Sequence, residues 1–340
     1  MRRSFILAAA CAVSAVLVAG ALAAKPPNGS TTGVGTVFLP NPVADLQDQS
    51  LTDQKDADYA ALAPAYHDVT LTDLDGSGRL CGAWACVISE TGDPAYSVTN
   101  TFRYRRDDDR FEQVMAYHWV TLAQRYLQSL GFGSELRPVN AEQQDIRINT
   151  WGQDNSYSWD KHDVLRFGKG GVDDAEDAEV ILHEYGHAVQ DSQQTPFGYG
   201  FTAEAGAIGE GFADYFAGTV STFYAPTPDP ECIADWDSVS YDPTAPHCLR
   251  RLDAGLHYPE NLDLTRIHSS GRIWSQALWE IRKALGHVKA DRIIFEAGFH
   301  YGASPTMPSA AAATIAVAEA MYGKATAKIV TEKFADRGLA

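Results

Sequence analysis

The chain has 340 residues, of which 45% are apolar and 21% are charged, a composition typical of a folded protein rather than a disordered one. Its length suits two packed lobes or two small domains. The formal net charge is −17, which argues against nucleic acid or an anionic membrane surface as a partner and leaves room for bound calcium.

The first 23 residues have the features of a secretory signal peptide. Arg2 and Arg3 precede an apolar run over residues 5–22, and Ala21-Leu22-Ala23 supplies the small residues of a cleavage site. We therefore predict cleavage near Ala23, a secreted protein, and no stable membrane association afterwards. A retained membrane anchor is the alternative interpretation.

Four cysteines follow this segment, namely Cys81, Cys86, Cys232 and Cys248. An even number of cysteines in an oxidising compartment predicts two disulfides. Three pairings are possible. The local pairing, Cys81 with Cys86 and Cys232 with Cys248, is favoured because each pair flanks a short loop.

In chain order, residues 24–50 are rich in Pro, Gly, Asn and Thr, which predicts an extended N-terminal arm. Residues 67–71 are predicted as a strand, and with the alternating residues 79–88 they form a hairpin signature around the turn at 73–78. That turn also resembles the start of a calcium loop. An EF-hand loop needs a glutamate at its twelfth position, where this chain has Trp84, so a simple turn is favoured.

The remaining elements have clearer patterns. Helices are predicted over residues 111–130, 203–220, 270–285, 309–322 and 326–336, and strands over 145–150 and within 155–167. The acidic run 173–179 opens one more helix, because acidic residues suit a helix N-terminus, and Ser309 is a predicted N-cap. The predicted fold class is α+β, with an arm over 24–65, a mixed α/β lobe over 66–190 and a mainly α-helical lobe over 191–340.

The strongest motif is His183-Glu184-Tyr185-Gly186-His187. Four residues make slightly more than one helical turn, so the two imidazoles project from one face and can bind one zinc ion. Glu184 lies about 100° round the helix, where its carboxylate can take a proton from a zinc-activated water without being a ligand. A motif of three fixed residues also arises by chance, in which case the two histidines only pack within a helix.

A second pair of residues supports the metal hypothesis. A catalytic zinc site has three protein ligands and one open position, and Glu210 can supply the third ligand. Asp214 follows one helical turn later and can accept a hydrogen bond from the far nitrogen of a ligand histidine. Two acids at this spacing can also form a solvated face, but their neighbours Phe212 and Phe216 are apolar, and a buried acid needs a partner.

With these motifs in place, the chain resembles the gluzincin metallopeptidases, that is, the thermolysin and fungalysin families, and it is most similar to the fungalysin-like group. The motifs that carry the resemblance are residues 183–187, 204–210, 209–214, 268–274, 117–119 and 337–339. The resemblance runs from about residue 69 to residue 340. It implies a two-lobe zincin architecture with the zinc helix between the lobes, one catalytic Zn²⁺, and protein or peptide substrates.

The resemblance also implies roles for single residues. His183, His187 and Glu210 match the zinc ligands, Glu184 the general base, and Asp214 the acid behind a ligand histidine. His268 matches the histidine that stabilises the oxyanion, and Asp263 matches the acid that orients it. Asn155 and Ser156 match an edge strand that holds the substrate backbone, and Arg250, with Arg251 as the fallback, matches an arginine that binds a substrate carbonyl.

The chain departs from this family pattern in places. Phe201 stands where thermolysin-type enzymes have a tyrosine that assists His268, and Tyr199 is a candidate substitute. Glu179 lies at the position of a thermolysin-like calcium ligand, but the other ligands cannot be traced. The predicted function is a secreted zinc metalloendopeptidase that hydrolyses peptide bonds with zinc-activated water and Glu184 as general base. The alternative is a catalytically inactive, zinc-stabilised extracellular binding or adhesion module.

Overall fold

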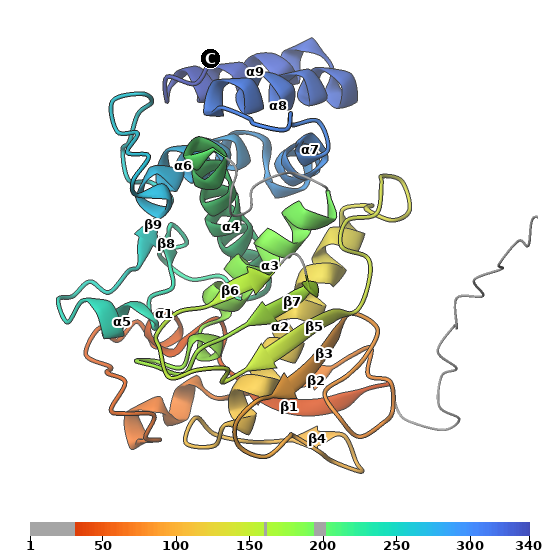
Figure 1. The fold of residues 1–340 in the computed structure, drawn as a ribbon, viewed down its shortest axis with the longest axis vertical. Helices are drawn as coiled ribbons and strands as arrows, with labels where there is room; N and C mark the ends of the chain where they lie inside the picture. Colours follow the sequence, from red (N-terminus) through yellow and green to blue (C-terminus); the bar gives the residue numbers. More distant parts are fainter. Residues whose placement is uncertain (1–30, 160–161, 194–201) are drawn as a thin grey trace, which may run out of the picture.

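A three-stranded β-sheet, a four-stranded β-sheet and a stack of α-helices follow one another along the long axis of the molecule, and β8 (Cys232–Ile233) and β9 (Arg250–Arg251) form a further two-stranded sheet (Figure 1). The computed structural model describes residues 31–159, 162–193 and 202–340. The predicted signal peptide and the pair Tyr199 and Phe201 lie outside these residues. Within the described part of the chain, no helix is long and apolar enough to cross a membrane.

The first sheet has three strands in the order β2-β1-β4. β1 (Gly33–Val37) pairs antiparallel with β2 (His67–Leu71) and parallel with β4 (Thr101–Phe102). The prediction of an extended arm over residues 24–50 was therefore wrong for this stretch. β1 is the middle strand of this sheet, and Val37 at its end and the next residue, Phe38, are fully buried. These apolar residues are few among the Gly and Thr residues around them, so the composition of the segment did not predict a buried strand.

The predicted hairpin between residues 67–71 and 79–88 was also wrong. β2 pairs with β1, whereas β3 (Ala85–Ser89) belongs to the second sheet, whose order is β3-β5-β7-β6. β3 pairs parallel with β5 (Gln144–Ile148) and has one buried face. This buried face explains why apolar and polar residues alternate over residues 79–88. The expected strand at 145–150 is confirmed as β5.

The second sheet presents an edge strand to the helical part of the molecule. β7 (Val164–Arg166) pairs with β5, and β6 (Tyr157–Trp159) lies antiparallel at the free edge. α2 (Arg110–Ser129) packs against both sheets and is buried on nearly every side, which confirms the helix predicted over 111–130. The predicted division of the chain at residues 65 and 190 stays a prediction.

The other helices form the second half of the fold. They are α3 (Ala178–Ser192), α4 (Ala203–Tyr224), α6 (Ile267–Leu285), α7 (His287–Gly298), α8 (Met307–Tyr322) and α9 (Lys324–Ala335). α7 was not predicted, because Gly286 alone separates it from α6 and no loop composition marks the break. The N-cap of α8 is Thr306 rather than Ser309, whose hydroxyl instead completes a capping box at the third helical position.

Short elements connect these parts. They are α1 (Pro42–Leu46), η1 (Ala60–Ala65), η3 (Asp174–Glu176), β8 (Cys232–Ile233), α5 (Ser238–Tyr241) and β9 (Arg250–Arg251). Disulfides join Cys81 to Cys86 and Cys232 to Cys248, which confirms the local pairing. The second disulfide closes the loop that carries α5.

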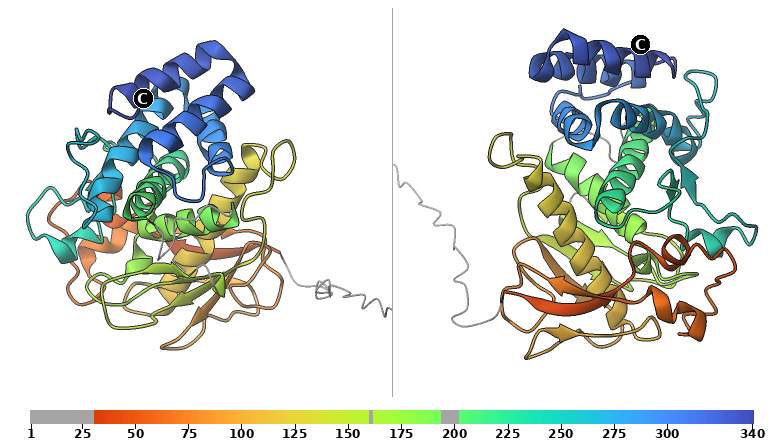
Figure 2. Two further views of the ribbon diagram at one scale, coloured as in Figure 1. Left: turned by 45° about the horizontal axis from the view of Figure 1, so that its top comes forward. Right: turned by 180° about the vertical axis from the view of Figure 1, so that it is seen from behind.

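α3 lies between the sheets and the helical stack, where Figure 2 shows it crossing below α4. Glycines set the spacing of these helices. A Cβ atom on Gly186 would lie 3.0 Å from the Cα of Ala213 in α4, and one on Gly211 would lie 2.2 Å from the carbonyl oxygen of Gly271 in α6. Because no side chain separates the helices there, residues on α3, α4 and the start of α6 can reach a common point.

Candidate metal centre

α3 carries the first three candidate residues. It begins at a fixed N-cap, since the Asp177 carboxylate accepts a hydrogen bond of 2.9 Å from the backbone N–H of Glu179. His183 and His187 lie one turn apart, and their Nε2 atoms are 3.2 Å from each other. His183 and Glu184 are buried, at 6% and 7% exposure. α3 therefore presents two imidazole nitrogens to one point, with a carboxylate beside them.

α4 brings Glu210 to the same point. Its Oε2 atom lies 3.3 Å from Nε2 of His183 and 3.8 Å from Nε2 of His187. One donor atom from each of the three residues lies within 4.8 Å of the other two. The helix packing described above thus assembles two nitrogens and one oxygen from residues that are far apart in the sequence.

The donor set fits a metal ion. Two imidazole nitrogens and one carboxylate oxygen, with a fourth position left open, are typical of catalytic zinc sites. Oε2 of Glu210 is buried and has no hydrogen-bond partner among the described residues. A buried carboxylate oxygen without a partner is costly, and a bound cation would remove that cost.

Asp214 and Arg250 lie behind the ligand candidates. Oδ1 of Asp214 is 2.8 Å from Nδ1 of His183, which leaves Nε2 of that ring directed at Glu210. The guanidinium of Arg250, on β9, donates to both oxygens of Asp214 at 2.7–3.0 Å. Burial alone would raise the pKa of Asp214, but Arg250 and His183 hold it well below its usual value. The carboxylate therefore stays ionised and fixes the orientation of the imidazole.

The neighbouring charges also favour the charged forms of His183 and Glu210. Burial opposes protonation of His183, but the nearby carboxylates of Asp214 and Glu210 raise the pKa of the imidazole to about 10. Burial also opposes ionisation of Glu210, but His183 and His187 lower its pKa to about 2. The centre thus has the two anionic carboxylates that would favour a divalent cation.

Glu184 has a different environment. Burial raises the pKa of its carboxyl group, while the charges of His183 and His187 and a backbone hydrogen bond from Ser158 oppose this rise. Ser158 belongs to β6, so Glu184 lies between the candidate metal position and the edge of the sheet. A carboxyl group with a raised pKa in that place is suited to accept and return a proton.

The remaining predicted residues lie at varying distances from the centre. His268 is in the first turn of α6, with Nε2 3.3 Å from Oε2 of Glu210 and a side chain that is 62% exposed. The carboxylate of Asp263 accepts hydrogen bonds from the backbone N–H and the hydroxyl of Thr265, at 2.9 and 2.7 Å, and its role in orienting His268 stays a prediction. Arg251, the fallback for Arg250, is bound to Asp229 and Asp253.

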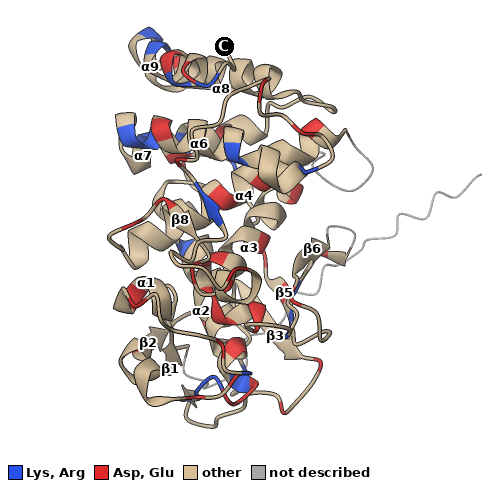
Figure 3. Cartoon of the chain, turned by 90° about the vertical axis from the view of Figure 1, so that its left-hand side faces the viewer, with Lys and Arg blue, Asp and Glu red and all other residues tan. Residues whose placement is uncertain are grey.

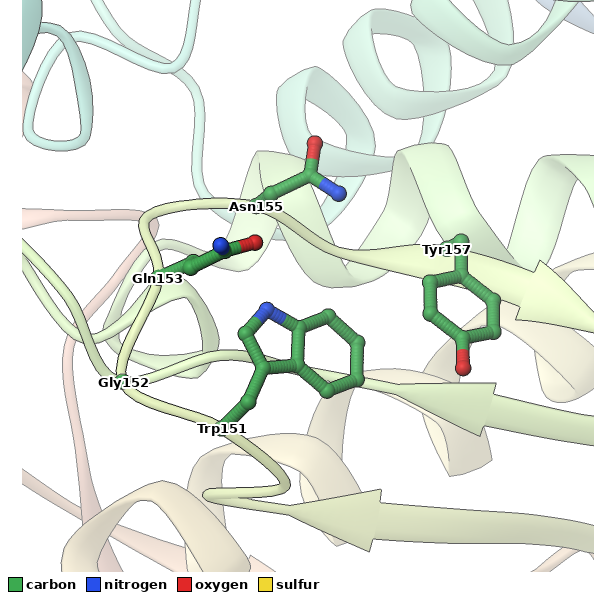
Figure 4. A pocket seen from close by; sticks show the side chains of 5 residues that line it. All are labelled: Trp151, Gly152, Gln153, Asn155 and Tyr157. Atoms are coloured by element: carbon green, nitrogen blue, oxygen red, sulfur yellow. The ribbon is translucent and has the colours of Figure 1, made fainter.

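Asn155 and Ser156 precede the edge strand β6. Asn155 lines a shallow pocket with Trp151 and Tyr157, and its amide points away from these two rings (Figure 4). The rings of Trp151 and Tyr157 stack with their centroids 5.1 Å apart. Asn155 and Ser156 also line a second cavity, of about 100 Å³, together with His183, Glu184 and His268. The edge strand and the candidate metal centre therefore share one cleft.

Two further residues of this cavity were not singled out in the sequence. Asp174 and Asp237 line it, and both are buried. In the acidic run 173–179, the side chain of Asp177 caps the start of α3. The run contains more acidic residues than one helix start needs. This excess was the only sequence feature that could have indicated a separate role for Asp174.

Comparisons with known proteins agree with this geometry. The model of the fungalysin metallopeptidase (M36) family matches residues 137–340. No significant match was found among curated proteins. Among solved structures, the precursor of protealysin, a metalloproteinase from Serratia proteamaculans, is similar with a TM-score of 0.61 and 17% identity, over 76% of this chain and 88% of that one. At this identity the likeness concerns the fold, and it confirms the two-lobe zincin class. Since the family model covers more than half of the sequence and includes the histidine motif, the chain belongs to the fungalysin metallopeptidase family.

Proposed function

We propose that this metallopeptidase is a secreted, zinc-dependent endopeptidase with one catalytic Zn²⁺ held by His183, His187 and Glu210. The observation that carries this proposal is the convergence of their donor atoms within 4.8 Å, beside the buried carboxyl group of Glu184. Two nitrogens and one oxygen suit zinc, whereas calcium and magnesium prefer sites made of oxygen ligands.

A bound zinc ion would polarise the scissile carbonyl and lower the pKa of a water molecule toward about 7. Glu184 acts as general base by taking a proton from the attacking water, and then as acid by returning it to the leaving amine. Asp214 keeps the His183 ring in one tautomer and one orientation, and Arg250 holds Asp214 in place. The negative charge that develops on the carbonyl oxygen is stabilised by His268.

The substrate lies along the edge of the second sheet. Asn155 and Ser156 lead into β6, the strand at the free edge, and an extended peptide can add to such an edge by backbone hydrogen bonds. Arg250 lines the same cavity, which supports its proposed role in binding a substrate carbonyl. The partners of the enzyme are therefore extended protein or peptide segments.

Secretion is proposed from the predicted signal peptide, and two disulfides are consistent with an oxidising compartment. Calcium remains a secondary proposal, with Glu179 as its candidate ligand. Both Glu179 oxygens accept hydrogen bonds of 2.8 Å, from the hydroxyl of Ser221 and the backbone N–H of Ala234. Metal analysis of the purified protein would count both ions.

The test is Glu184→Gln in the full-length secreted protein. The amide keeps the shape of the side chain but cannot take a proton, so we expect casein hydrolysis to fall at least about 100-fold while one zinc per chain is retained. Glu319→Gln, at an exposed position on α8, is the matched control and should keep full activity. Activity of Glu184→Gln near that of the wild type would contradict the role of Glu184.

A zinc-stabilised binding module without turnover is the second candidate. It predicts one bound zinc and no cleavage by the wild-type protein in a diverse peptide library, with or without a chelator. The buried carboxyl group of Glu184 beside the three donor atoms favours the enzyme, because a purely structural site needs no such group and normally has four protein ligands.

A further inference from the structure

The cavity beside the candidate metal centre has an unusual wall. It has a volume of about 100 Å³, and its lining includes His183 and Glu184 as well as Asp174 and Asp237. Any group that fills it therefore lies next to the bond that Glu184 acts on. In a peptide substrate, that group is the side chain of a residue adjoining the hydrolysed bond.

Three carboxyl groups meet at this wall. Asp154 comes from the loop before β6, Asp174 from η3 and Asp237 from the residue before α5, and one oxygen of each lies within 4.8 Å of the others. Asp174 and Asp237 are 3% and 4% exposed. The Oδ1 atom of each of the three has no hydrogen-bond partner within the described ranges.

Such a cluster is unfavourable in its ionised form unless a cation joins it. Burying an ionised carboxylate without a partner is strongly unfavourable, and like charges at this spacing repel one another. The hydroxyl of Ser156 donates to Oδ2 of Asp174 and leaves the three Oδ1 atoms without a partner among the described residues. Arg250 is the basic residue that lines the cavity besides the histidines, but its guanidinium is engaged with both oxygens of Asp214. A cation that neutralises the ionised cluster therefore has to come from outside the described residues.

The rest of the lining indicates which cation fits. Val180, Ile233 and Leu249 contribute apolar surface to the same cavity. Lysine and arginine bury a stem of methylene groups along apolar surface while their charged end reaches polar partners. A divalent metal ion takes oxygen ligands and would make no use of this apolar surface.

We propose that Asp174 and Asp237 select substrates with lysine or arginine next to the hydrolysed bond. This inference depends on the proposed function, because it assigns the substrate class of the same cleft. The two carboxylates bind the ammonium or guanidinium group, and Val180, Ile233 and Leu249 contact its methylene stem. Asp154 stands behind them and adds negative charge.

The test uses the full-length enzyme and quenched fluorescent peptides that differ only at the two residues flanking one cleavable bond. Lysine, arginine, leucine and glutamate are compared on each side, and kcat/KM is measured. We expect the wild type to prefer lysine or arginine over leucine by at least about tenfold on one side of the bond, since a hydrogen bond to a charged group contributes that much. Glutamate should be the poorest substrate.

Two variants separate this selection from the chemistry. Asp174→Asn and Asp237→Asn should each lower kcat/KM for the basic peptide at least about tenfold while changing the leucine peptide less than about twofold. Asp242→Asn, at an exposed position near the end of α5, is the control and should retain the preference. Both variants should fold, because they remove buried carboxyl groups without changing side-chain size.

The outcomes that overturn the inference are distinct from those that overturn the function. Equal kcat/KM for lysine and leucine peptides in an enzyme that Glu184→Gln inactivates would refute the selection and leave the peptidase intact. A second divalent cation in the purified enzyme, lost in Asp237→Asn, would refute it in favour of a metal site. If the wild type cleaves none of the peptides and no casein, the proposed function itself fails.

Discussion

At the scale of the residue, Asp214 connects the candidate metal centre to the protein behind it. It is fully buried, it receives the Nδ1–H of His183, and it is held by two nitrogens of Arg250. A neutral amide at this position could still accept a hydrogen bond, but it would pair poorly with Arg250 and could present its NH₂ group to the imidazole. The orientation of the ligand would then be lost in part of the molecules.

We therefore predict that Asp214→Asn lowers zinc affinity about 10- to 100-fold, the usual effect of removing a carboxylate behind a ligand histidine. Competition with a coloured zinc chelator measures the affinity directly. Asp107→Asn, at an exposed position before α2, is the matched control. An affinity for Asp214→Asn equal to that of the control would show that the carboxylate does not orient the ligand.

The residues of the site differ in how far the sequence could predict them. Two pairs of residues are each separated by one helical turn: His183 with His187, and Glu210 with Asp214. Local spacing was therefore enough to place each pair on one helix face. Asp174 and Asp237 come from η3 and from the loop before α5, and no local pattern indicates that they share a wall. The role of Asp263 toward His268 is implied by the resemblance and stays a prediction, while its carboxylate accepts hydrogen bonds from Thr265.

At the scale of the element, the distance between α3 and α4 determines whether the donor atoms meet. Gly186, inside the histidine motif, faces the Cα of Ala213 and the Cβ of Phe216 at 3.0 and 3.3 Å from an added Cβ. Backbone and buried side chains surround this point and cannot yield easily. A methyl group there would push α3 away from α4, and with it His183 and His187 away from Glu210.

Gly186→Ala is therefore expected to destabilise the protein by about 1–3 kcal/mol, the cost of overpacking a core, and to weaken zinc binding as well. Chemical denaturation and chelator competition measure the two effects. Gly302→Ala is the control, because nothing lies within 4 Å of an added Cβ there. If Gly186→Ala kept both stability and zinc affinity, the close approach of the helices would not be what assembles the site.

Elements with a strong local pattern were predictable, and elements defined by their partners were not. α2, α4 and α9 have helical spacing of apolar residues over many turns and were expected close to where they lie. β1 has five residues and was missed, because its strand character depends on pairing with β2 and β4. The hairpin predicted between residues 67–71 and 79–88 was wrong for the same reason. Alternating apolar and polar residues indicate a strand, but they do not show which strand pairs with it.

At the scale of the whole molecule, the acidic composition has a consequence for stability. Acidic residues gather in the middle of the structure, around the start of α3 and the neighbouring α1 and β8 (Figure 3). Several of these acids are buried, and Arg106, itself buried, binds Glu176 through its Nε atom at 2.9 and 3.0 Å. One buried arginine cannot neutralise the whole group. The folded protein therefore holds protons on carboxyl groups that are ionised in the unfolded chain.

The pKa values give the direction of the resulting pH dependence. Burial raises the pKa of Asp173 to about 8, of Glu176 to about 7 and of Asp235 to about 7, against about 4 in an unfolded chain. Between pH 4 and pH 8 the folded state thus binds more protons than the unfolded state, so the free energy of unfolding falls as the pH rises. His118, whose pKa burial lowers to about 4, acts in the opposite sense, but it is outnumbered.

We predict that the protein, freed of metal with a chelator, melts at a higher temperature at pH 5 than at pH 8. Each of these carboxyl groups contributes at most about 1.4 kcal/mol per pH unit to the slope of stability against pH. Asp173→Asn removes one of them, so it should reduce that slope and stabilise the protein most at pH 8, whereas Asp107→Asn should leave the slope unchanged. A melting temperature that rises from pH 5 to pH 8 would mean that these buried acids are ionised in the folded protein, and that a bound cation or a closer basic partner balances their charge.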